Sequence, residues 1–287
     1  MSRLLRRTMT VLVASALTVG TLASPAFSAE ASRYVALGDS FVAGPLVPDH
    51  TGSPAGCLRS TGNYPSLMAA DLGVDEFLDV SCSGAVTDDM FNAQNTAVGT
   101  NPPQLDALNE QTTLVTLGIG GNDVGFANIL VDCLLSGSTQ PVNAPCQDKY
   151  THEDGTDQLQ QRIDETKPKV ESVLGEIANR APNAQVIVVG YPAILPEADG
   201  CWPKVPLAKG DIPYLDGIEQ SLNSALADAA NAHGATYVEN YERGHDVCAP
   251  RDARWVEGVI PTKPAAPVHP NADGMQAVAQ TVLGSIA

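Results

Sequence analysis

The sequence predicts a parallel α/β fold in which helices cover both faces of one central sheet. Short apolar runs of the kind that form buried parallel strands recur along the chain and alternate with segments of helical spacing. The first three of these runs lead directly into glycines and small polar residues. In open sheets of this class, ligands bind at the carboxyl ends of the strands. We therefore look for function at the ends of the predicted strands.

The local patterns predict each element in turn. We expect strands in five apolar runs, at residues 33–38, 76–85, 113–123, 185–192 and 235–239. Helical spacing predicts helices at residues 63–73, 156–180, 214–232 and from Asn271 to the end. In the first helix, Pro65 suits the first turn and Gly73 suits the C-terminal cap. We expect long loops at residues 45–62, 133–153, 193–213 and 242–268.

The amino terminus has the pattern of a secretory signal peptide. A basic start with three arginines precedes an apolar stretch at residues 9–22, and small residues follow. The stretch is short for a membrane span. Small residues allow cleavage after Ser28, and cleavage after Ala31 fits as well. We therefore expect residues 1–28 to be removed, residues 29–287 to form a single domain, and the mature protein to be secreted without integral membrane association.

The charge of the chain excludes two classes of partner. The sequence contains 33 acidic and 16 basic residues, and its formal net charge is -17. Such a protein is repelled by nucleic acid and by anionic lipid surfaces. We expect neither as a partner, and we expect a monomer.

Cysteine usage agrees with secretion. The six cysteines are an even number, and in an oxidising compartment they predict disulfides, although the spacing alone leaves many pairings open. None of the spacings is the C-x-x-C that is typical of zinc sites.

The first three strands lead into turns that carry a coherent set of chemical groups. These turns are Gly38-Asp39-Ser40, residues 82–85 and residues 120–123, and a parallel sheet places them on one edge. The Ser40 hydroxyl can attack a carbonyl carbon. The backbone N–H groups of Ser40 and Gly84 and the side-chain amide of Asn122 can stabilise the oxyanion that forms.

Each of these residues also has a structural interpretation. Asp39 or Ser40 can cap the next helix, Gly84 can serve an ordinary turn, and Asn122 can be a helix N-cap. The joint occurrence favours acyl transfer, with Asp39 supporting the turn.

A serine nucleophile needs a base, and His269 is the best placed of five histidines. It stands in the segment "PVHPNADG", just before the final helix, whose expected N-cap is Asn271. A final helix can dock beside the first strand and hold the imidazole near the carboxyl end of that strand. The other four histidines lie in predicted loops or at a helix end, at His50, His152, His233 and His245.

These four blocks, in this order, resemble the SGNH (GDSL) hydrolase family, with Ser40, Gly84, Asn122 and His269 at the matching positions. The six cysteines together with "CSGA" and "GIGGND" are similar to the secreted bacterial lipase and esterase branch. That branch implies a flavodoxin-like three-layer α/β/α sandwich with a five-stranded parallel sheet. It also implies sequential disulfides, which here would be Cys57–Cys82, Cys133–Cys146 and Cys201–Cys248.

The resemblance implies a carboxylic-ester hydrolase, a lipase or esterase that acts on an acyl ester or lipid. Ser40 would form an acyl-enzyme, with His269 as base and with no cofactor or metal. An alternative is a phospholipase A or acyltransferase that uses the same site. Another is a secreted binding protein that has kept the fold without catalysis. A missing block would have favoured this alternative, and all four blocks are present.

One position departs from the family. Most members carry an aspartate three residues before the histidine, and this chain has Ala266 there. We expect the backbone carbonyl of Ala266 to accept the Nδ1 proton of His269 and to orient the ring. The alternative is a distant carboxylate, Asp246 or Asp252.

Overall fold

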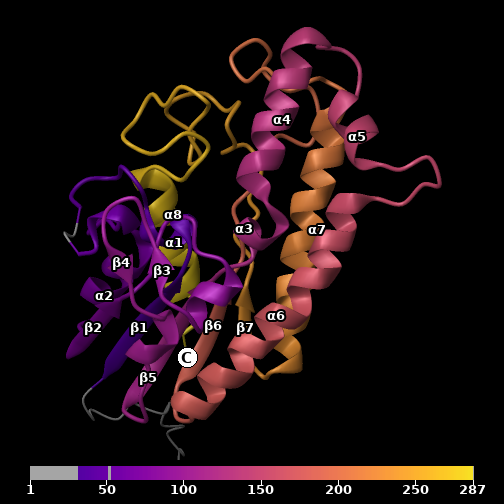
Figure 1. The fold of residues 1–287 in the computed structure, drawn as a ribbon. Coiled ribbons are helices and arrows are strands. Elements are labelled where there is room, and N and C mark those ends of the chain that lie inside the picture. Colours follow the sequence, from indigo (N-terminus) through magenta and orange to yellow (C-terminus); the bar gives the residue numbers. More distant parts are fainter. Residues whose placement is uncertain (1–31, 51–52, 287) are drawn as a thin grey trace, which may run out of the picture. The chain divides into compact units, whose positions relative to one another are not determined.

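Five parallel strands form the central sheet of the computed structural model, which describes residues 32–50 and 53–286 (Figure 1). The strands run in the order β2-β1-β5-β6-β7, and every neighbouring pair is parallel. Their bounds are Arg33–Gly38 (β1), Glu76–Asp79 (β2), Thr112–Gly118 (β5), Gln185–Val189 (β6) and Thr236–Val238 (β7). With the first strand second in the row, this is the flavodoxin-like order. The predicted fold class is confirmed.

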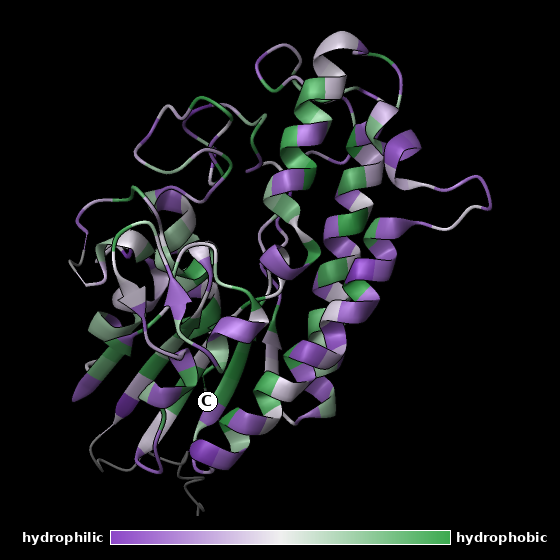
Figure 2. Ribbon diagram, in the orientation of Figure 1, coloured by the Kyte–Doolittle hydropathy of each residue, from purple (hydrophilic) through white to green (hydrophobic). Residues whose placement is uncertain are grey.

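Alternating side chains of the strands pack into two hydrophobic clusters, one on each face of the sheet. In β1, Val35 and Leu37 face one hydrophobic cluster, whereas Tyr34 and Ala36 face another. This alternation follows from the period of two in a β-strand. Because both faces are covered, the central strands carry apolar runs, most clearly β6, which is green in Figure 2.

Two pairs of helices form the outer layers. One pair is α2 (Tyr64–Leu72) and α8 (Ala272–Leu283), which pack against the side of Tyr34 and Ala36. The other pair is α6 (Gln158–Arg180) and α7 (Asp211–Ala232), which pack against the side of Val35 and Leu37. The predicted helix ends of α2 are confirmed, since Gly73 caps it and Pro65 lies in its first turn.

Shorter elements cluster around the carboxyl edge of the sheet. The α-helices there are α1 (Ser40–Ala43), α3 (Gly121–Val124), α4 (Phe126–Thr139) and α5 (Pro145–Tyr150). Three 3₁₀ turns and a small antiparallel hairpin complete the set, at Ala55–Cys57 (η1), Thr87–Met90 (η2), Gln104–Ala107 (η3), Gln94–Asn95 (β3) and Thr100–Asn101 (β4).

The expectation of a loop at residues 133–153 is wrong. Helix α4 continues through the first part of that segment to Thr139, and α5 occupies Pro145–Tyr150. The apolar side chains of Phe126, Leu130 and Leu134 recur at intervals of four residues, which is the spacing of one helix face.

Three disulfides tie the segments at this edge together. They join Cys57 to Cys82, Cys133 to Cys146 and Cys201 to Cys248, which is the sequential pairing that the resemblance implies. The second disulfide links α4 to α5.

The predicted signal peptide lies outside the described residues, and so does the expected cleavage at Ser28 or Ala31. The described residues belong to one compact unit. Among the residues that the structure describes, no helix has both the length and the apolar character to cross a membrane.

Candidate active site

Ser40 and His269 meet at the carboxyl edge of the sheet. Ser40 is the first residue of α1, directly after β1, and His269 lies just before α8. The Oγ of Ser40 lies 2.8 Å from Nε2 of His269, although the two residues are 229 positions apart. The expected N-cap of the last helix is confirmed, because the side chain of Asn271 accepts hydrogen bonds from the backbone of Asp273 and Gly274. This cap fixes the chain directly after His269.

The orienting group for His269 is a backbone carbonyl, but it belongs to a different residue from the one expected. Nδ1 of His269 lies 2.8 Å from the carbonyl oxygen of Pro267, not of Ala266. The Ala266 carbonyl instead accepts the backbone N–H of His269 at 3.2 Å. Val268 between them has φ 58°, in the left-handed region that β-branched residues rarely adopt. This turn directs the Pro267 carbonyl back toward the ring.

The carbonyl also determines the tautomer of His269. A carbonyl oxygen can only accept a hydrogen bond, so the proton of the neutral imidazole lies on Nδ1. Nε2 is then free to accept the Ser40 hydroxyl proton. Burial lowers the pKa of His269 below its usual value of 6.5, and the bond to Pro267 offsets part of that effect. The imidazole is therefore neutral at pH 7, which is the state that a general base requires.

Neither alternative carboxylate contacts the imidazole. Asp246 accepts the backbone N–H of Cys248 at 2.8 Å, and Asp252 is exposed. Within residues 32–50 and 53–286, the ring of His269 makes hydrogen bonds only to Ser40 and to Pro267.

The other histidines have local roles or face solvent. The ring of His245 stacks on Trp255 with centroids 3.7 Å apart, and Nε2 of His50 accepts the backbone N–H of Leu46. His152 and His233 are exposed.

The three residues that carry the expected oxyanion donors line one cavity together with His269. They are Ser40, Gly84 and Asn122. Within the described part of the chain, the backbone N–H groups of Ser40 and Gly84 donate to no protein acceptor. Gly84 has φ 81°, and an added Cβ would have room, so the position needs glycine for its backbone conformation. The side-chain amide of Asn122 donates to the Ala85 carbonyl at 2.9 Å and keeps its second N–H for a ligand.

Tyr191 is part of the site, and the sequence analysis missed it. Its hydroxyl donates to Oδ2 of Asp39 at 2.6 Å and accepts the backbone N–H of Gly121 at 2.9 Å. Oδ1 of Asp39 accepts the N–H of Phe41 and caps α1. Tyr191 thereby joins the turn of Ser40 to the turn of Asn122. Its position just after β6, on the same edge as the other turns, is the signal that could have identified it.

Burial of Asp39 affects its ionisation. Desolvation raises the pKa of this carboxyl to about 7, against the opposing effect of its bonds to Tyr191 and Phe41. Asp39 makes no hydrogen bond to His269. Its contacts support the turn, as the sequence analysis expects.

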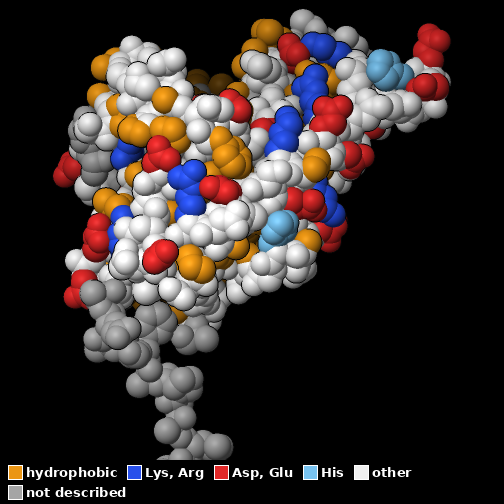
Figure 3. Space-filling model, turned by 60° about the horizontal axis from the view of Figure 1, so that its bottom comes forward, with side chains coloured by type: hydrophobic (Ala, Val, Ile, Leu, Met, Phe, Trp, Pro, Cys, Tyr) orange, Lys and Arg blue, Asp and Glu red, His pale blue; other side chains and the backbone are white. Residues whose placement is uncertain are grey.

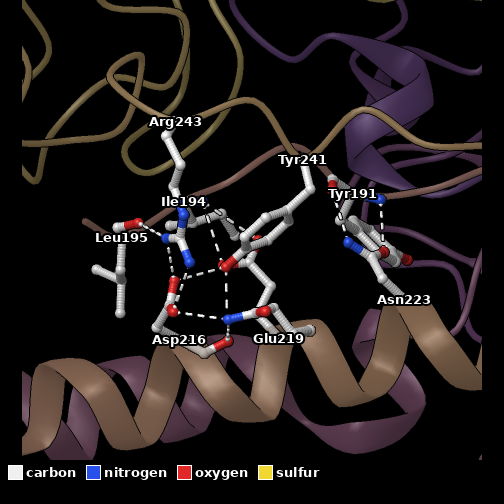
Figure 4. Close-up of polar contacts among 9 residues, drawn as sticks. Tyr191, Ile194, Leu195, Asp216, Glu219, Asn223, Tyr241 and Arg243 are labelled. Atoms are coloured by element: carbon white, nitrogen blue, oxygen red, sulfur yellow. Dashed lines mark hydrogen bonds and ion pairs between the residues drawn. The ribbon is translucent and has the colours of Figure 1, made fainter. Parts of the chain in front are cut away.

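Helix α7 holds the segment that carries Tyr191 (Figure 4). The side chain of Asn223 accepts the N–H of Tyr191 and donates to its carbonyl, both at 2.9 Å. One turn toward the start of the helix, both carboxyl oxygens of Glu219 lie 3.2 Å from the N–H of Ile194. Asp216 forms a bidentate pair with Arg243. Buried side chains of α7 thus hold the segment after β6 in place beside the site.

An apolar cavity of about 540 Å³ extends from Ser40 along α4. Ser40, Gly84, Asn122 and His269 line part of its wall. Phe126, Leu130, Val131 and Leu134 of α4 and Ile194, Leu222 and Val259 line much of the rest. The stripe from Phe126 to Leu134 rises about 12 Å along the helix. A cavity with convergent polar groups in an apolar wall suits a ligand with one reactive polar group and a long apolar part.

Comparison with known proteins places the chain in a recognisable group. Residues 36–277 match the GDSL-like lipase/acylhydrolase family. The chain is 41% identical to a protein named Lipase 2 from Streptomyces coelicolor, over 96% of this chain and 95% of the relative.

Two solved structures are similar over 90% of this chain and 100% of their own. One is a phospholipase A1 from Streptomyces albidoflavus NA297, at 30% identity and a TM-score of 0.75. The other is an extracellular lipase from Streptomyces rimosus, at 29% identity and a TM-score of 0.73.

Proposed function

Because this chain belongs to the GDSL-like lipase/acylhydrolase family and is a carboxylic-ester hydrolase, we propose that Ser40 is its nucleophile and His269 its general base. The observation that carries the proposal is the 2.8 Å contact between Ser40 Oγ and His269 Nε2, in a cavity that the oxyanion donors also line. Nucleophile and base within hydrogen-bond reach, with the base oriented by a third group, are what acyl transfer by serine requires.

The acylation step uses the groups in their present positions. Nε2 of His269 takes the hydroxyl proton of Ser40 as Oγ attacks the ester carbonyl carbon. The negative charge on the carbonyl oxygen is stabilised by the N–H groups of Ser40 and Gly84 and the amide of Asn122. The imidazolium then gives its proton to the leaving alcohol, the bond to that alcohol breaks, and an acyl-enzyme remains.

Deacylation repeats the same steps with water. Nε2 of His269 takes a proton from water, and the hydroxide attacks the acyl carbon. The proton returns to Oγ of Ser40 as the ester bond to the enzyme breaks, and the carboxylic acid leaves. The Pro267 carbonyl keeps the Nδ1–H tautomer through both half-reactions.

The apolar wall of α4 favours esters with long acyl chains. Burial of each methylene contributes about 0.8 kcal/mol, or roughly a fourfold gain in kcat/KM per carbon until the groove is filled. We therefore expect kcat/KM to rise from p-nitrophenyl acetate to p-nitrophenyl decanoate.

The most direct test of the proposed function is removal of the Ser40 hydroxyl. Ser40→Ala should lower kcat for p-nitrophenyl butyrate by on the order of 10⁴ and leave the circular dichroism spectrum unchanged. A fluorophosphonate probe should label Ser40 in the wild type, as peptide mass spectrometry would show. A folded Ser40→Ala protein with undiminished turnover would refute the assignment.

A phospholipase A is the second candidate, favoured by the similarity to the phospholipase A1 of Streptomyces albidoflavus. Release of fatty acid from phosphatidylcholine and from triglyceride emulsions, compared at equal ester concentration, distinguishes the two substrate classes.

Secretion is part of the proposal. It is supported by the signal-peptide pattern at residues 1–28 and by three disulfides, which persist in oxidising compartments. Mass spectrometry of the protein from culture medium would locate the new amino terminus.

A further inference from the structure

Several exposed apolar side chains either line the cavity or directly follow a residue that lines it. In the part of the chain that the structure describes, ten large hydrophobic side chains are exposed, and five of them line the cavity or neighbour a residue that does. We call these five the rim; they are Leu46, Leu58, Val131, Leu135 and Ile260. Leu135 is 66% exposed and Ile260 is 80% exposed. Burial against other parts of this chain therefore does not explain them.

The rim is made by several separate segments. Leu135 follows the cavity residue Leu134 on α4, and Ile260 follows the cavity residue Val259 in the long segment before His269. Leu46 follows Pro45, another cavity residue, and Leu58 lies close to the Cys57–Cys82 disulfide. Clustering of side chains from such distant parts of the sequence is the pattern of an interaction surface, not of scattered surface residues.

Charge is almost absent from the segments that carry the rim. Residues 40–48, 53–58, 126–143 and 258–268 contain only Asp132 and Lys263 as charged residues. Asp132 is paired with Lys149, and Lys263 with Asp273. The whole chain nevertheless has 33 acidic residues and a net charge of -17. Figure 3, which brings the opposite edge of the molecule forward, shows acidic and basic side chains spread over that face.

We propose that the rim docks on the surface of a lipid aggregate without net charge, so that an acyl chain passes from the lipid into the cavity along α4. The proposal rests on the proposed function for its substrate. A lipid chain that crossed water would expose every methylene at a cost in free energy. Contact between an apolar rim and the lipid avoids that exposure. The negative charge of the rest of the protein makes an anionic surface a poorer partner than a neutral one.

The test measures binding separately from hydrolysis. Full-length protein is sedimented with vesicles of ether-linked phosphatidylcholine, which has no carboxylic-ester bond to cleave. Wild type should sediment with the vesicles. Leu135→Glu and Ile260→Glu should each lower the partition coefficient at least about tenfold, because a carboxylate replaces an apolar contact. Leu72→Glu is the matched control, since Leu72 is 37% exposed and ends α2 just before the start of β2, toward the opposite edge of the sheet. It should change partitioning less than about twofold.

Dissolved substrate provides the check on folding. All three variants should hydrolyse p-nitrophenyl acetate as fast as wild type, because none of the three side chains lines the cavity. Wild type that stays in the supernatant, rim variants that bind as well as wild type, or an equal loss in Leu72→Glu would overturn the docking proposal. Tighter binding to phosphatidylglycerol vesicles than to neutral ones would also contradict it. Protein that binds vesicles but leaves p-nitrophenyl acetate intact would refute the proposed function instead.

Discussion

Phe41 stacks on the ring of His269, with ring centroids 4.9 Å apart and planes tilted by 30°. The ring of Phe41 also packs edge-on against Tyr191, with centroids 5.1 Å apart and planes at 83°. The residue directly after Ser40 therefore packs against the imidazole that contacts Ser40, and Tyr191 packs against that residue in turn. Since no carboxylate among the described residues holds the imidazole, this aromatic contact and the Pro267 carbonyl together restrict its motion.

Loss of the Phe41 ring should have a larger effect on kcat than on KM. Aromatic pairs contribute about 0.5–1.5 kcal/mol beyond their buried area, so Phe41→Leu should reduce kcat for p-nitrophenyl butyrate about threefold to tenfold. KM should change less. Phe77→Leu is the control, because Phe77 forms a similar pair with Tyr34 at 5.1 Å, away from the site. A kcat that falls equally in both variants would show a general packing effect.

The backbone acceptor of His269 predicts tolerance of carboxylate loss. Asp246→Asn and Asp252→Asn should keep kcat within about tenfold of wild type, whereas His269→Ala should nearly abolish it. Pro267→Ala should keep most activity as well, because the carbonyl remains. The measurement is kcat on a dissolved ester. A loss of about a thousandfold in either aspartate variant would mean that a carboxylate serves the imidazole.

The pH profile should reflect the lowered pKa of His269. Only neutral His269 can accept the Ser40 proton, so kcat/KM should rise with pH as the imidazole loses its proton. Burial disfavours the imidazolium, so the midpoint should lie below 6.5. The unfolded chain binds this proton more tightly than the folded one, so acid should also favour unfolding in the same range. A midpoint above 6.5 in the rate profile would contradict this account.

Removal of the Tyr191 hydroxyl should lower both the stability of the protein and its kcat. Tyr191→Phe leaves the N–H of Gly121 and one oxygen of Asp39 without their buried partner, which should cost about 1–3 kcal/mol in unfolding free energy. It should also lower kcat, because two turns of the site lose their common bond. Tyr214→Phe removes a similar bond, to Asp157 at 3.2 Å, away from the cavity. That variant should keep wild-type kcat; denaturant titration and ester kinetics measure both effects.

Two of the disulfides should affect activity differently. Replacement of either pair by alanine should cost about 2–4 kcal/mol of stability. The Cys57–Cys82 bond adjoins the turn of Gly84, so its loss should slow hydrolysis of acetate and decanoate esters alike. The Cys133–Cys146 bond holds α4 against α5, so its loss should reduce kcat/KM mainly for decanoate. Equal chain-length profiles in the two variants would argue that α4 does not hold the acyl chain.

The sequence was sufficient for the sheet and for the ordered set of turns, because these depend on local pattern. The apolar runs that became β1, β5 and β6 are unambiguous, and each turn at the carboxyl edge carries a distinctive residue. The roles of Ser40, Gly84, Asn122 and His269 stay predictions, now with a geometry that supports them.

Other features of the site depend on backbone conformation and on contacts between distant residues, which sequence patterns do not reveal. The Pro267 carbonyl, and not that of Ala266, accepts the Nδ1 proton of His269 because Val268 has a left-handed backbone conformation. The residue preferences of valine would not suggest this conformation. The role of Tyr191 depends on contacts across three strands. The sequence analysis missed helix α4, although the apolar face at Phe126, Leu130 and Leu134 can be seen in the sequence.

The acceptor at Pro267 also bears on how such a site changes over evolutionary time. An orienting aspartate can be lost through a single codon change, but a backbone carbonyl is present whatever residue is encoded. It has no protonated form that would weaken it in acid surroundings. Variation at residues 266–268 is then constrained by the chain path and not by the identity of an acidic side chain. Mutations that alter the left-handed turn at Val268, rather than the chemistry of its neighbours, are the ones that selection would remove.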